Sequence, residues 1–209
     1  SSPSPSPISI LSLSLKTIFQ PDHSWTNQLP KDKTITLITT GDVIPARTVN
    51  YKMTIYNDFT HPFKKTADFL QSADIALINL ESPLIKNCPV VNGGMVFCGN
   101  QRFIEGLNFA GIDVVNLANN HTLNYGLDGL SQTKELLEQN NIIAAGLPDS
   151  MFNESIHRTI PKQLVIKEIK GARIGFLGWN LLEKFEENKV LNIIKQAKNE
   201  VDLLIVSIH

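Results

Sequence analysis

Several residue types are scarce in this sequence, and each shortage excludes a class of protein. Only two cysteines and two tryptophans occur among 209 residues. The spacing from Cys88 to Cys98 matches no common zinc knuckle. Trp25 and Trp179 lie too far apart in the sequence to indicate a carbohydrate platform. There is also no glycine-rich phosphate loop and no nucleophile elbow, so neither motif assigns a function.

An excess of one charge and a long apolar run are missing as well. Lys and Arg number 19 against 20 Asp and Glu, a formal net charge of −1. Such a chain has no general field for holding nucleic acid or an anionic membrane surface, and nucleic acid is not an expected partner. The best apolar runs, 74–80 and 201–208, have the length of strands, whereas a membrane span needs about 18 residues or more.

The residues that are present suit one globular domain with an appended segment. Hydrophobic residues make up 42 % and charged residues 19 % of the chain, enough to build a packed core. The Ser/Pro-rich start predicts an extended tether over residues 1–33, with a small strand at 8–15 as the alternative, and a folded domain over 34–209. Because the chain begins with Ser1 and ends in a strand-like run, we interpret it as a fragment of a longer protein.

Within the domain, short apolar runs alternate with amphipathic segments of helical length, which predicts an α/β fold. A hairpin across Lys170 and Gly171 indicates that the sheets are mixed rather than purely parallel. The expected strands lie at about 34–39, 75–80, 113–117, 142–145, 163–169, 173–177 and 202–208, and the expected helices at 62–72, 102–110, 127–139 and 187–198.

Three of these strands share a spacing. Asp74, Asp113 and Asp202 each open an apolar run, and seven residues later come, in order, Glu81, Asn120 and His209. Seven extended residues span roughly 23 Å, so the three later side chains are expected at one edge of a sheet. Asp42 follows another expected strand and joins them, as does His121. Ligands of α/β sheets bind at this carboxyl edge.

These side chains predict a metal site. Taken singly, each is explained as well by turn chemistry or by the polar surface that follows a buried strand. Together they offer oxygen and nitrogen donors without a thiolate, a set that suits Mn, Fe, Mg or Zn. An ion held there would polarise a phosphoryl or carbonyl oxygen and activate water.

Three motifs resemble the capsule-synthesis protein CapA family, the poly-γ-glutamate synthesis group within the calcineurin-like metallophosphatases. They are Gly41-Asp42-Val43, the segment Asn79-Leu80-Glu81-Ser82-Pro83-Leu84, and Asn116-Leu117-Ala118-Asn119-Asn120-His121 followed by Tyr125-Gly126. The resemblance runs from about Thr34 to His209. It implies two mixed sheets packed as a sandwich with helices outside, and a site for two divalent ions.

The resemblance also implies roles for single residues. Asp42, Glu81, Asn120 and His209 would be metal ligands, and His121 the catalytic proton donor. Arg47 would contact an anionic substrate group, with a solvated loop arginine as the alternative, and Asn119 would also bind substrate.

The sequence departs from the family pattern at three places. Two of these departures leave the expected metal ligands unchanged, and the third removes expected ligands. Ile44-Pro45-Ala46 replaces the usual Met-Leu-Gly, and Asn124 stands where the family often has Asp. The final Gly-His-x-His element has no counterpart before the chain stops at His209. Metal binding by residues 1–209 is therefore expected to be weak or incomplete.

The two cysteines bear on location. Pro89 and the pair Gly93 and Gly94 are turn formers that would bring Cys88 and Cys98 together. We favour a disulfide, which predicts an oxidising, extracytoplasmic location. Separately, we expect membrane anchoring through a segment outside this chain. Two reduced cysteines in a cytosolic loop are the alternative.

The resulting functional hypothesis is a CapA-type protein in synthesis, export or anchoring of poly-γ-glutamate or a related capsule polymer, with a metal-dependent hydrolase activity. Its expected partners are an anionic polymer or phosphoester substrate and other capsule-synthesis membrane components. One alternative is a general metallophosphoesterase acting on a small phosphoester. The other is a protein that binds an anionic polymer without cleaving it.

Overall fold

The computed structural model describes residues 30–32, 34–152 and 160–209. The chain falls into two compact units, Ser1–Thr34 and Ile35–His209, and the features below belong to the second. The predicted tether over residues 1–33 lies outside the described residues, apart from positions 30–32.

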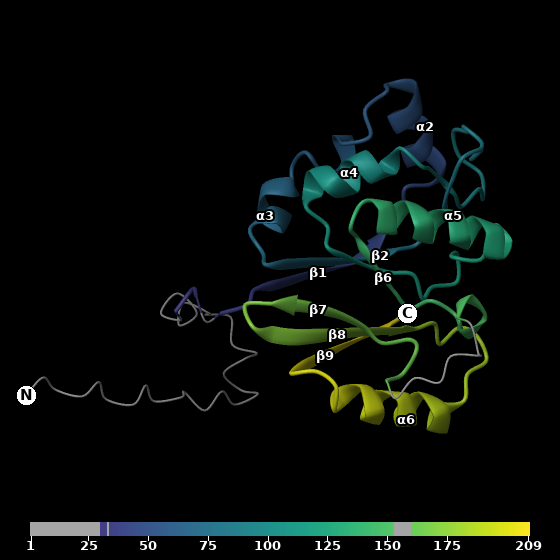
Figure 1. Ribbon diagram of the computed structural model, residues 1–209. Helices are drawn as coiled ribbons and strands as arrows, with labels where there is room; N and C mark the ends of the chain where they lie inside the picture. Colours follow the sequence, from purple (N-terminus) through teal and green to yellow (C-terminus); the bar gives the residue numbers. More distant parts are fainter. Residues whose placement is uncertain (1–29, 33, 153–159) are drawn as a thin grey trace, which may run out of the picture. The chain divides into compact units, whose positions relative to one another are not determined.

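The second unit is built of four layers, a helical layer on each side of two sheets (Figure 1). One sheet contains β1 (Leu37–Val43), β2 (Ile75–Leu80), β5 (Val114–Asn116) and β6 (Ile143–Ala145). The other contains β7 (Val165–Ile169), β8 (Ala172–Trp179) and β9 (Leu203–Ile208). Four helices cover the first sheet, namely α2 (Arg47–Ile55), α3 (Ala67–Gln71), α4 (Phe103–Ala110) and α5 (Gly126–Gln139), and α6 (Glu187–Lys198) covers the second.

The predicted α/β fold of two packed sheets flanked by helices is confirmed, with one correction to the strand directions. The three-stranded sheet is mixed, since β7 and β8 are antiparallel and β8 and β9 parallel. The four-stranded sheet, in the order β1-β2-β5-β6, is wholly parallel rather than mixed. Each of its connections contains at least one helix, the kind of crossover that parallel pairing requires.

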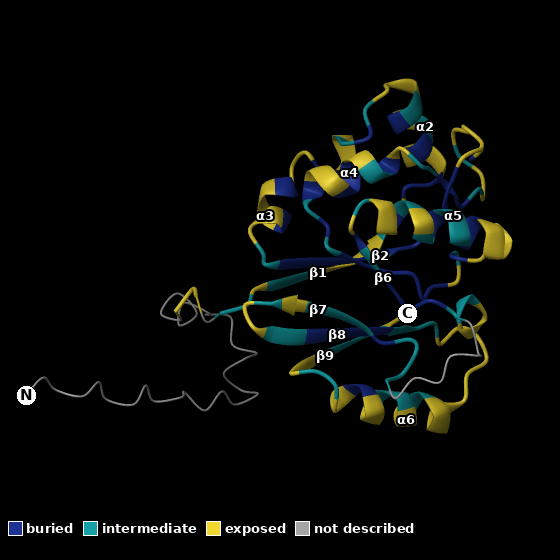
Figure 2. Ribbon diagram, viewed as in Figure 1, coloured by how far each residue is buried: buried dark blue, intermediate teal, exposed yellow. Residues whose placement is uncertain are grey.

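Buried residues lie on both faces of the four-stranded sheet, as the burial colours of Figure 2 show. Between the sheets, Ile75 and Leu77 pack in one cluster with Ile174 and Phe176. On the opposite face of β2, Ala76, Ile78 and Leu80 pack with residues of α4. Because β2 is covered on both faces, its sequence is apolar at every position except Asn79, a composition typical of buried parallel strands.

Some elements were misplaced by the sequence analysis. β1 begins at Leu37 and continues through Val43 instead of ending at residue 39. The predicted helix over 62–72 is two pieces, a 3-10 turn at His61–Phe63 and α3, separated by Thr66 at φ −124° and ψ −12°. Helix α2 was not predicted, because it has no side-chain N-cap and no acidic residue in its first turn. The short pair β3 (Leu84–Ile85) and β4 (Gly99–Asn100) was not predicted either.

The predicted hairpin is confirmed. β7 and β8 pair from Val165 with Phe176 to Ile169 with Ala172. The two residues between them, Lys170 and Gly171, have φ values of 48° and 81°. Positive φ at both central positions is typical of the tight turn that matches strand twist.

The aspartates that precede the strands accept backbone hydrogen bonds at the amino ends of the strands, the edge opposite the candidate metal centre. The Asp74 carboxylate accepts the Thr36 backbone N–H at 2.8 Å, Asp113 accepts that of Ala76 at 2.9 Å, and Asp202 accepts that of Arg173 at 2.7 Å. Two of them also pair with lysines of the β7–β8 hairpin, Asp74 with Lys170 at 2.8 Å and Asp113 with Lys167 at 3.0 Å. The recurring aspartates therefore hold strand starts in place.

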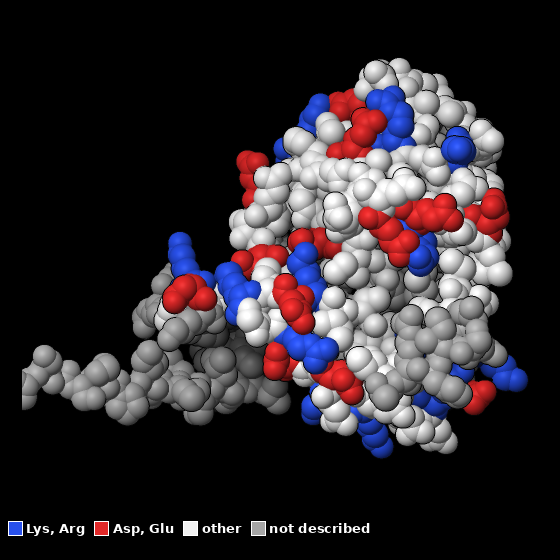
Figure 3. All heavy atoms as spheres, viewed as in Figure 1, with Lys and Arg blue, Asp and Glu red and all other residues white. Residues whose placement is uncertain are grey.

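Acidic and basic side chains are interspersed on the face shown in Figure 3. This mixture accords with the formal net charge of −1. Among the described residues, no helix combines the length and the apolar character needed to cross a bilayer.

Candidate metal centre

The carboxyl ends of three strands from both sheets bring Asp42, Glu81 and His209 together. Asp42 is the second-to-last residue of β1, Glu81 directly follows β2, and His209 directly follows β9. The β1–β2 register slips by one residue between Thr39 and Asp42, so Asp42 pairs with Asn79. Such a bulge re-aims the side chains beyond it. The sequence analysis placed Asp42 after the strand, but in the structure Asp42 belongs to β1 itself.

The three side chains are close enough to share one ion. One ligand atom from each lies within 4.8 Å of the other two. His209 Nε2 is 3.5 Å from Glu81 Oε1, and His209 Nδ1 is 3.7 Å from Asp42 Oδ1. Two carboxylates and an imidazole are donors that several divalent ions accept.

The electrostatics of Glu81 fit a cation. Glu81 is 7 % exposed, and this burial raises the pKa of its carboxyl above the usual range. The Asp42 carboxylate raises that pKa further, while His209 and His121 lower it. Among the described residues, the ion-pair partners of these two carboxylates are histidines, with no lysine or arginine. A divalent ion would remove both the burial cost and the repulsion.

Asn120 reaches the same edge by a different route from the one expected. Its Oδ1 lies 2.9 Å from His209 Nε2, so the side chain borders the three ligands. The expectation of seven extended residues from Asp113 is wrong, because β5 ends at Asn116 and the chain then turns. For Glu81 and His209 the extended spacing does hold, through β2 and β9.

His121 lies beside the three ligands. Its Nε2 is 3.8 Å from Glu81 Oε1, and its Nδ1 is 2.9 Å from Asn124 Nδ2. The ring stacks on Phe97, with centroids 3.8 Å apart and an angle of 9° between the planes. His121 is thus held by contacts on its edge and on one face.

Asn79 is a central residue that the sequence analysis did not assign. Its Nδ2 donates to Asp42 Oδ1 at 2.7 Å and lies 3.3 Å from His209 Nδ1. Its Oδ1 accepts hydrogen bonds from Asn116 and Asn119, at 2.9 and 3.2 Å. One amide therefore links a ligand of each sheet to a buried network. The available signal was a polar residue inside the apolar run of β2.

Two glycines make room for this network. A Cβ on Gly178 would lie 2.0 Å from Asn116 Oδ1, and a Cβ on Gly146 would lie 2.5 Å from the same atom. Gly178 belongs to β8 and Gly146 follows β6, so one glycine comes from each sheet. Asn116 itself is 2 % exposed. The two sheets approach closely where they enclose this amide.

The profile of the family described as "Bacterial capsule synthesis protein PGA_cap" matches residues 36–209, well over half of the chain. The chain belongs to this family. The resemblance inferred from the three sequence motifs is thereby confirmed.

Curated relatives are similar at low identity. The chain is 28 % identical over 132 residues to "Uncharacterized protein y4sH" of Sinorhizobium fredii, which covers 60 % of the chain and 27 % of the relative. "Capsule biosynthesis protein CapA" of Bacillus anthracis is 22 % identical over 153 residues, covering 71 % and 35 %. "PGA biosynthesis protein CapA" of Bacillus subtilis is 22 % identical over 185 residues, covering 81 % and 47 %. The chain thus spans less than half the length of these relatives.

A solved structure described as a novel phosphatase from Mycoplasma pneumoniae is also similar. It has a TM-score of 0.44 and 18 % sequence identity, and the match covers 84 % of the chain and 55 % of that structure.

The two residues expected to bind substrate lie in different surroundings. Arg47 is exposed, and its guanidinium carbon lies 5.8 Å from the Phe97 ring centroid. Asn119 is 4 % exposed. Its Nδ2 donates to Asn79 and to the Leu80 carbonyl, and its Oδ1 accepts from two backbone N–H groups and the Thr122 hydroxyl. Both ends of the Asn119 amide are therefore hydrogen-bonded within the protein, and its expected contact with substrate stays a prediction.

Cys88 and Cys98 form a disulfide with an S–S distance of 2.03 Å. Both are buried, and they cluster with Ile85. The bond joins the ends of the segment between β3 and β4 in this PGA_cap chain.

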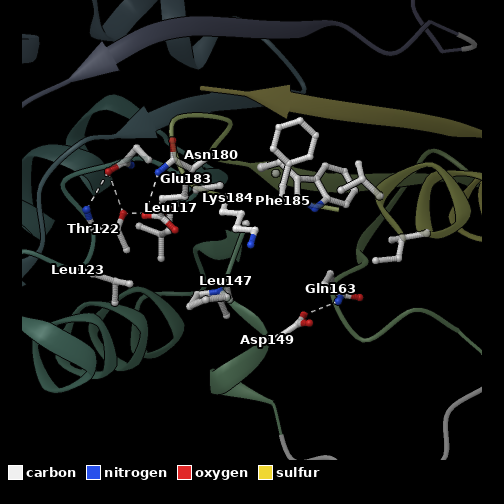
Figure 4. A pocket seen from close by; sticks show the side chains of 18 of the residues that line it. Leu117, Thr122, Leu123, Leu147, Asp149, Gln163, Asn180, Glu183, Lys184 and Phe185 are labelled. Carbon is white, nitrogen blue, oxygen red and sulfur yellow. Dashed lines mark hydrogen bonds between the residues drawn. The ribbon is translucent and has the colours of Figure 1, made fainter. Parts of the chain in front are cut away.

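A cavity of about 510 Å³ opens at the carboxyl ends of β6 and β8 (Figure 4). Asn180, Glu183 and Lys184 line one side, and Leu147 and Asp149 line another. The three closely spaced ligands do not line this cavity. The loop after β8 that lines the cavity nevertheless contacts the candidate metal centre, because the Leu181 backbone N–H donates to the His209 carbonyl at 2.9 Å.

Proposed function

We propose that this chain acts in the synthesis, export or anchoring of poly-γ-glutamate or a related capsule polymer, outside the cytoplasm. Membership of the PGA_cap family and the names of the two CapA relatives support a role connected with the capsule. The disulfide between Cys88 and Cys98 supports an oxidising location.

We further propose that Asp42, Glu81, Asn120 and His209 bind a divalent metal. The observation that carries this proposal is the buried Glu81 carboxylate, placed beside Asp42 and His209 without a lysine or arginine among the described residues. A bound ion would supply Lewis acidity to a phosphoryl or carbonyl oxygen. The donors have no thiolate, so Mn, Fe, Mg and Zn remain the proposed metals.

His121 would then hold and deliver a proton. With Asn124 oriented so that its Nδ2 donates to His121 Nδ1, the neutral imidazole carries its proton on Nε2. That nitrogen faces Glu81 across 3.8 Å, at the edge of the ligand group. The neutral Nε2–H would donate a hydrogen bond to a leaving group bound at this edge. For proton transfer His121 would act as the imidazolium, with the Asn124 amide turning its oxygen toward Nδ1, and would return to the neutral imidazole when the leaving group takes the Nε2 proton, which is general acid catalysis.

Arg47 would bind an anionic group of the substrate. It is exposed beside Phe97, the same ring that covers His121. A guanidinium suits carboxylate and phosphate oxygens alike, because it presents paired N–H donors. The cavity at the ends of β6 and β8 would take a more distant part of the substrate.

Turnover measurements test the catalytic proposal. The chain would be incubated with Mn²⁺ and, in separate arms, an aryl phosphate and a γ-glutamyl amide. We expect one substrate to be hydrolysed, with a loss of about 100-fold or more in His121→Ala. Glu135→Gln, an exposed change on α5, is the control. Binding of poly-γ-glutamate that survives His121→Ala, with no hydrolysis of either substrate, would contradict catalysis and favour a binding protein.

A further inference from the structure

The segment closed by the disulfide lies against the candidate metal centre. It connects β3 to β4, and Phe97 directly precedes the bonded Cys98. Cys98 is fully buried and Phe97 is 9 % exposed. The position of the Phe97 backbone is therefore fixed by a covalent link one residue away.

Phe97 contacts His121 across the full ring face. The 3.8 Å centroid separation and the 9° angle describe two nearly parallel rings in van der Waals contact. The other described contacts of the imidazole, with Asn124 and Glu81, are made at its edge. Edge contacts alone leave the ring free to swing about its bond to the backbone, whereas a stacked face stops that rotation.

Helix α2 is fastened to the same segment. Buried Asn50 accepts the Asn100 backbone N–H at 3.0 Å, and its Nδ2 lies 3.4 Å from the Pro89 carbonyl. A Cβ on Gly99 would lie 2.8 Å from the Pro45 carbonyl, so the chain entering α2 packs closely on β4. The segment thus contacts the helix on which Arg47 stands.

We propose that Phe97 is a positioning residue for His121, and that the Cys88–Cys98 disulfide holds Phe97 in place for this task. In this arrangement the disulfide acts on the site and does more than close a surface loop. The effect on a reaction rests on the proposed function of His121, but the ring placement does not.

The ring placement is tested by NMR on the metal-free chain, because protons over an aromatic face are shifted upfield. The imidazole protons of His121 are assigned by their loss in His121→Gln. We expect them upfield of those of a free imidazole in the unsubstituted protein. We expect Phe97→Tyr to retain the shift, and both Phe97→Leu and the double variant Cys88→Ala/Cys98→Ala to lose it.

Phe69→Leu provides the matched control, since Phe69 is 66 % exposed on α3. It should leave the His121 signals unchanged. Ordinary imidazole shifts in the unsubstituted protein, or shifts that persist in folded Phe97→Leu, would overturn the proposal. The first comparison needs no substitution, so it decides the matter even where Phe97→Leu does not fold.

Activity supplies a second and separable readout. Where the chain hydrolyses a substrate, we expect Phe97→Leu to lower kcat by about 10- to 100-fold with little change in KM, and Phe97→Tyr to restore it. Failure of metal binding or turnover would count against the proposed function while leaving the ring shift intact. Unchanged kcat in folded Phe97→Leu would contradict the positioning role.

Discussion

Asn79 shows how one residue in a buried strand can organise ligands from two sheets. Its amide donates to Asp42 and faces His209, while Asn116 and Asn119 hold it from behind. Groups that orient metal ligands in this way affect affinity nearly as strongly as the ligands themselves. Asn79 would orient the ligands of the proposed ion without itself contacting that ion.

Replacing this amide should weaken metal binding without unfolding the chain. We expect Asn79→Ala to raise the Kd for Mn²⁺ by about 10- to 100-fold, measured by calorimetry. Asn108→Ala is the matched control, because Asn108 is exposed and bonds to Asn140 away from the site. An unchanged Kd in folded Asn79→Ala would show that the amide does not orient the ligands.

At the scale of the elements, the close approach of β6 and β8 depends on Gly178. A methyl group there would lie 2.0 Å from Asn116 Oδ1 and 3.0 Å from the Gly146 Cα. We expect Gly178→Ala to lower the free energy of unfolding by about 1–3 kcal/mol in urea titrations. Gly41→Ala is the control, since its added Cβ meets nothing within 4 Å. Equal stability of the two variants would refute the packing described around Asn116.

The strand-opening aspartates predict a dependence of stability on pH. Lys170 holds the pKa of Asp74 below its ordinary value of 3.8, and the Thr36 backbone N–H acts in the same direction. A carboxyl whose pKa is lowered by folding stabilises the fold above its ordinary pKa, and this contribution is lost as the pH falls through the folded value.

We therefore expect Asp74→Asn to reduce the free energy of unfolding by about 1–2 kcal/mol at pH 7. The difference from the unsubstituted chain should shrink below pH 3.8. Asp68→Asn, at an exposed position of α3, should change stability by less than about 0.5 kcal/mol. A difference for Asp74→Asn that stays constant from pH 7 to pH 3 would contradict this explanation.

The sequence predicted the elements whose pattern is local. The β7–β8 hairpin was predicted from Lys170-Gly171, and the helix expected over 102–110 is α4, which ends at Gly111 with φ 69°. Helix α2 was missed because its start carries no capping signal. The β3–β4 pair was missed because two-residue strands have no periodicity to detect.

At the scale of the whole molecule, residues far apart in the sequence converge because parallel strands from two sheets end at one edge. The strand pattern predicted the approach of Asp42, Glu81 and His209, since it depends only on strand direction. The Asn79 network was not predicted, because which amide faces which depends on the register between strands and on the packing of one sheet on the other. The burial of Asn119 was not predicted either, because a sequence motif does not show which of its residues are covered in the fold.

The most direct measurement is calorimetric titration of Mn²⁺ into the metal-free chain and into Glu81→Gln, with Glu135→Gln as the control. We predict saturable binding by the unsubstituted chain and by Glu135→Gln, and a Kd at least about 100-fold higher for Glu81→Gln. Equal binding by all three proteins, or no binding by the unsubstituted chain, would contradict the claim that Asp42, Glu81 and His209 hold a metal ion.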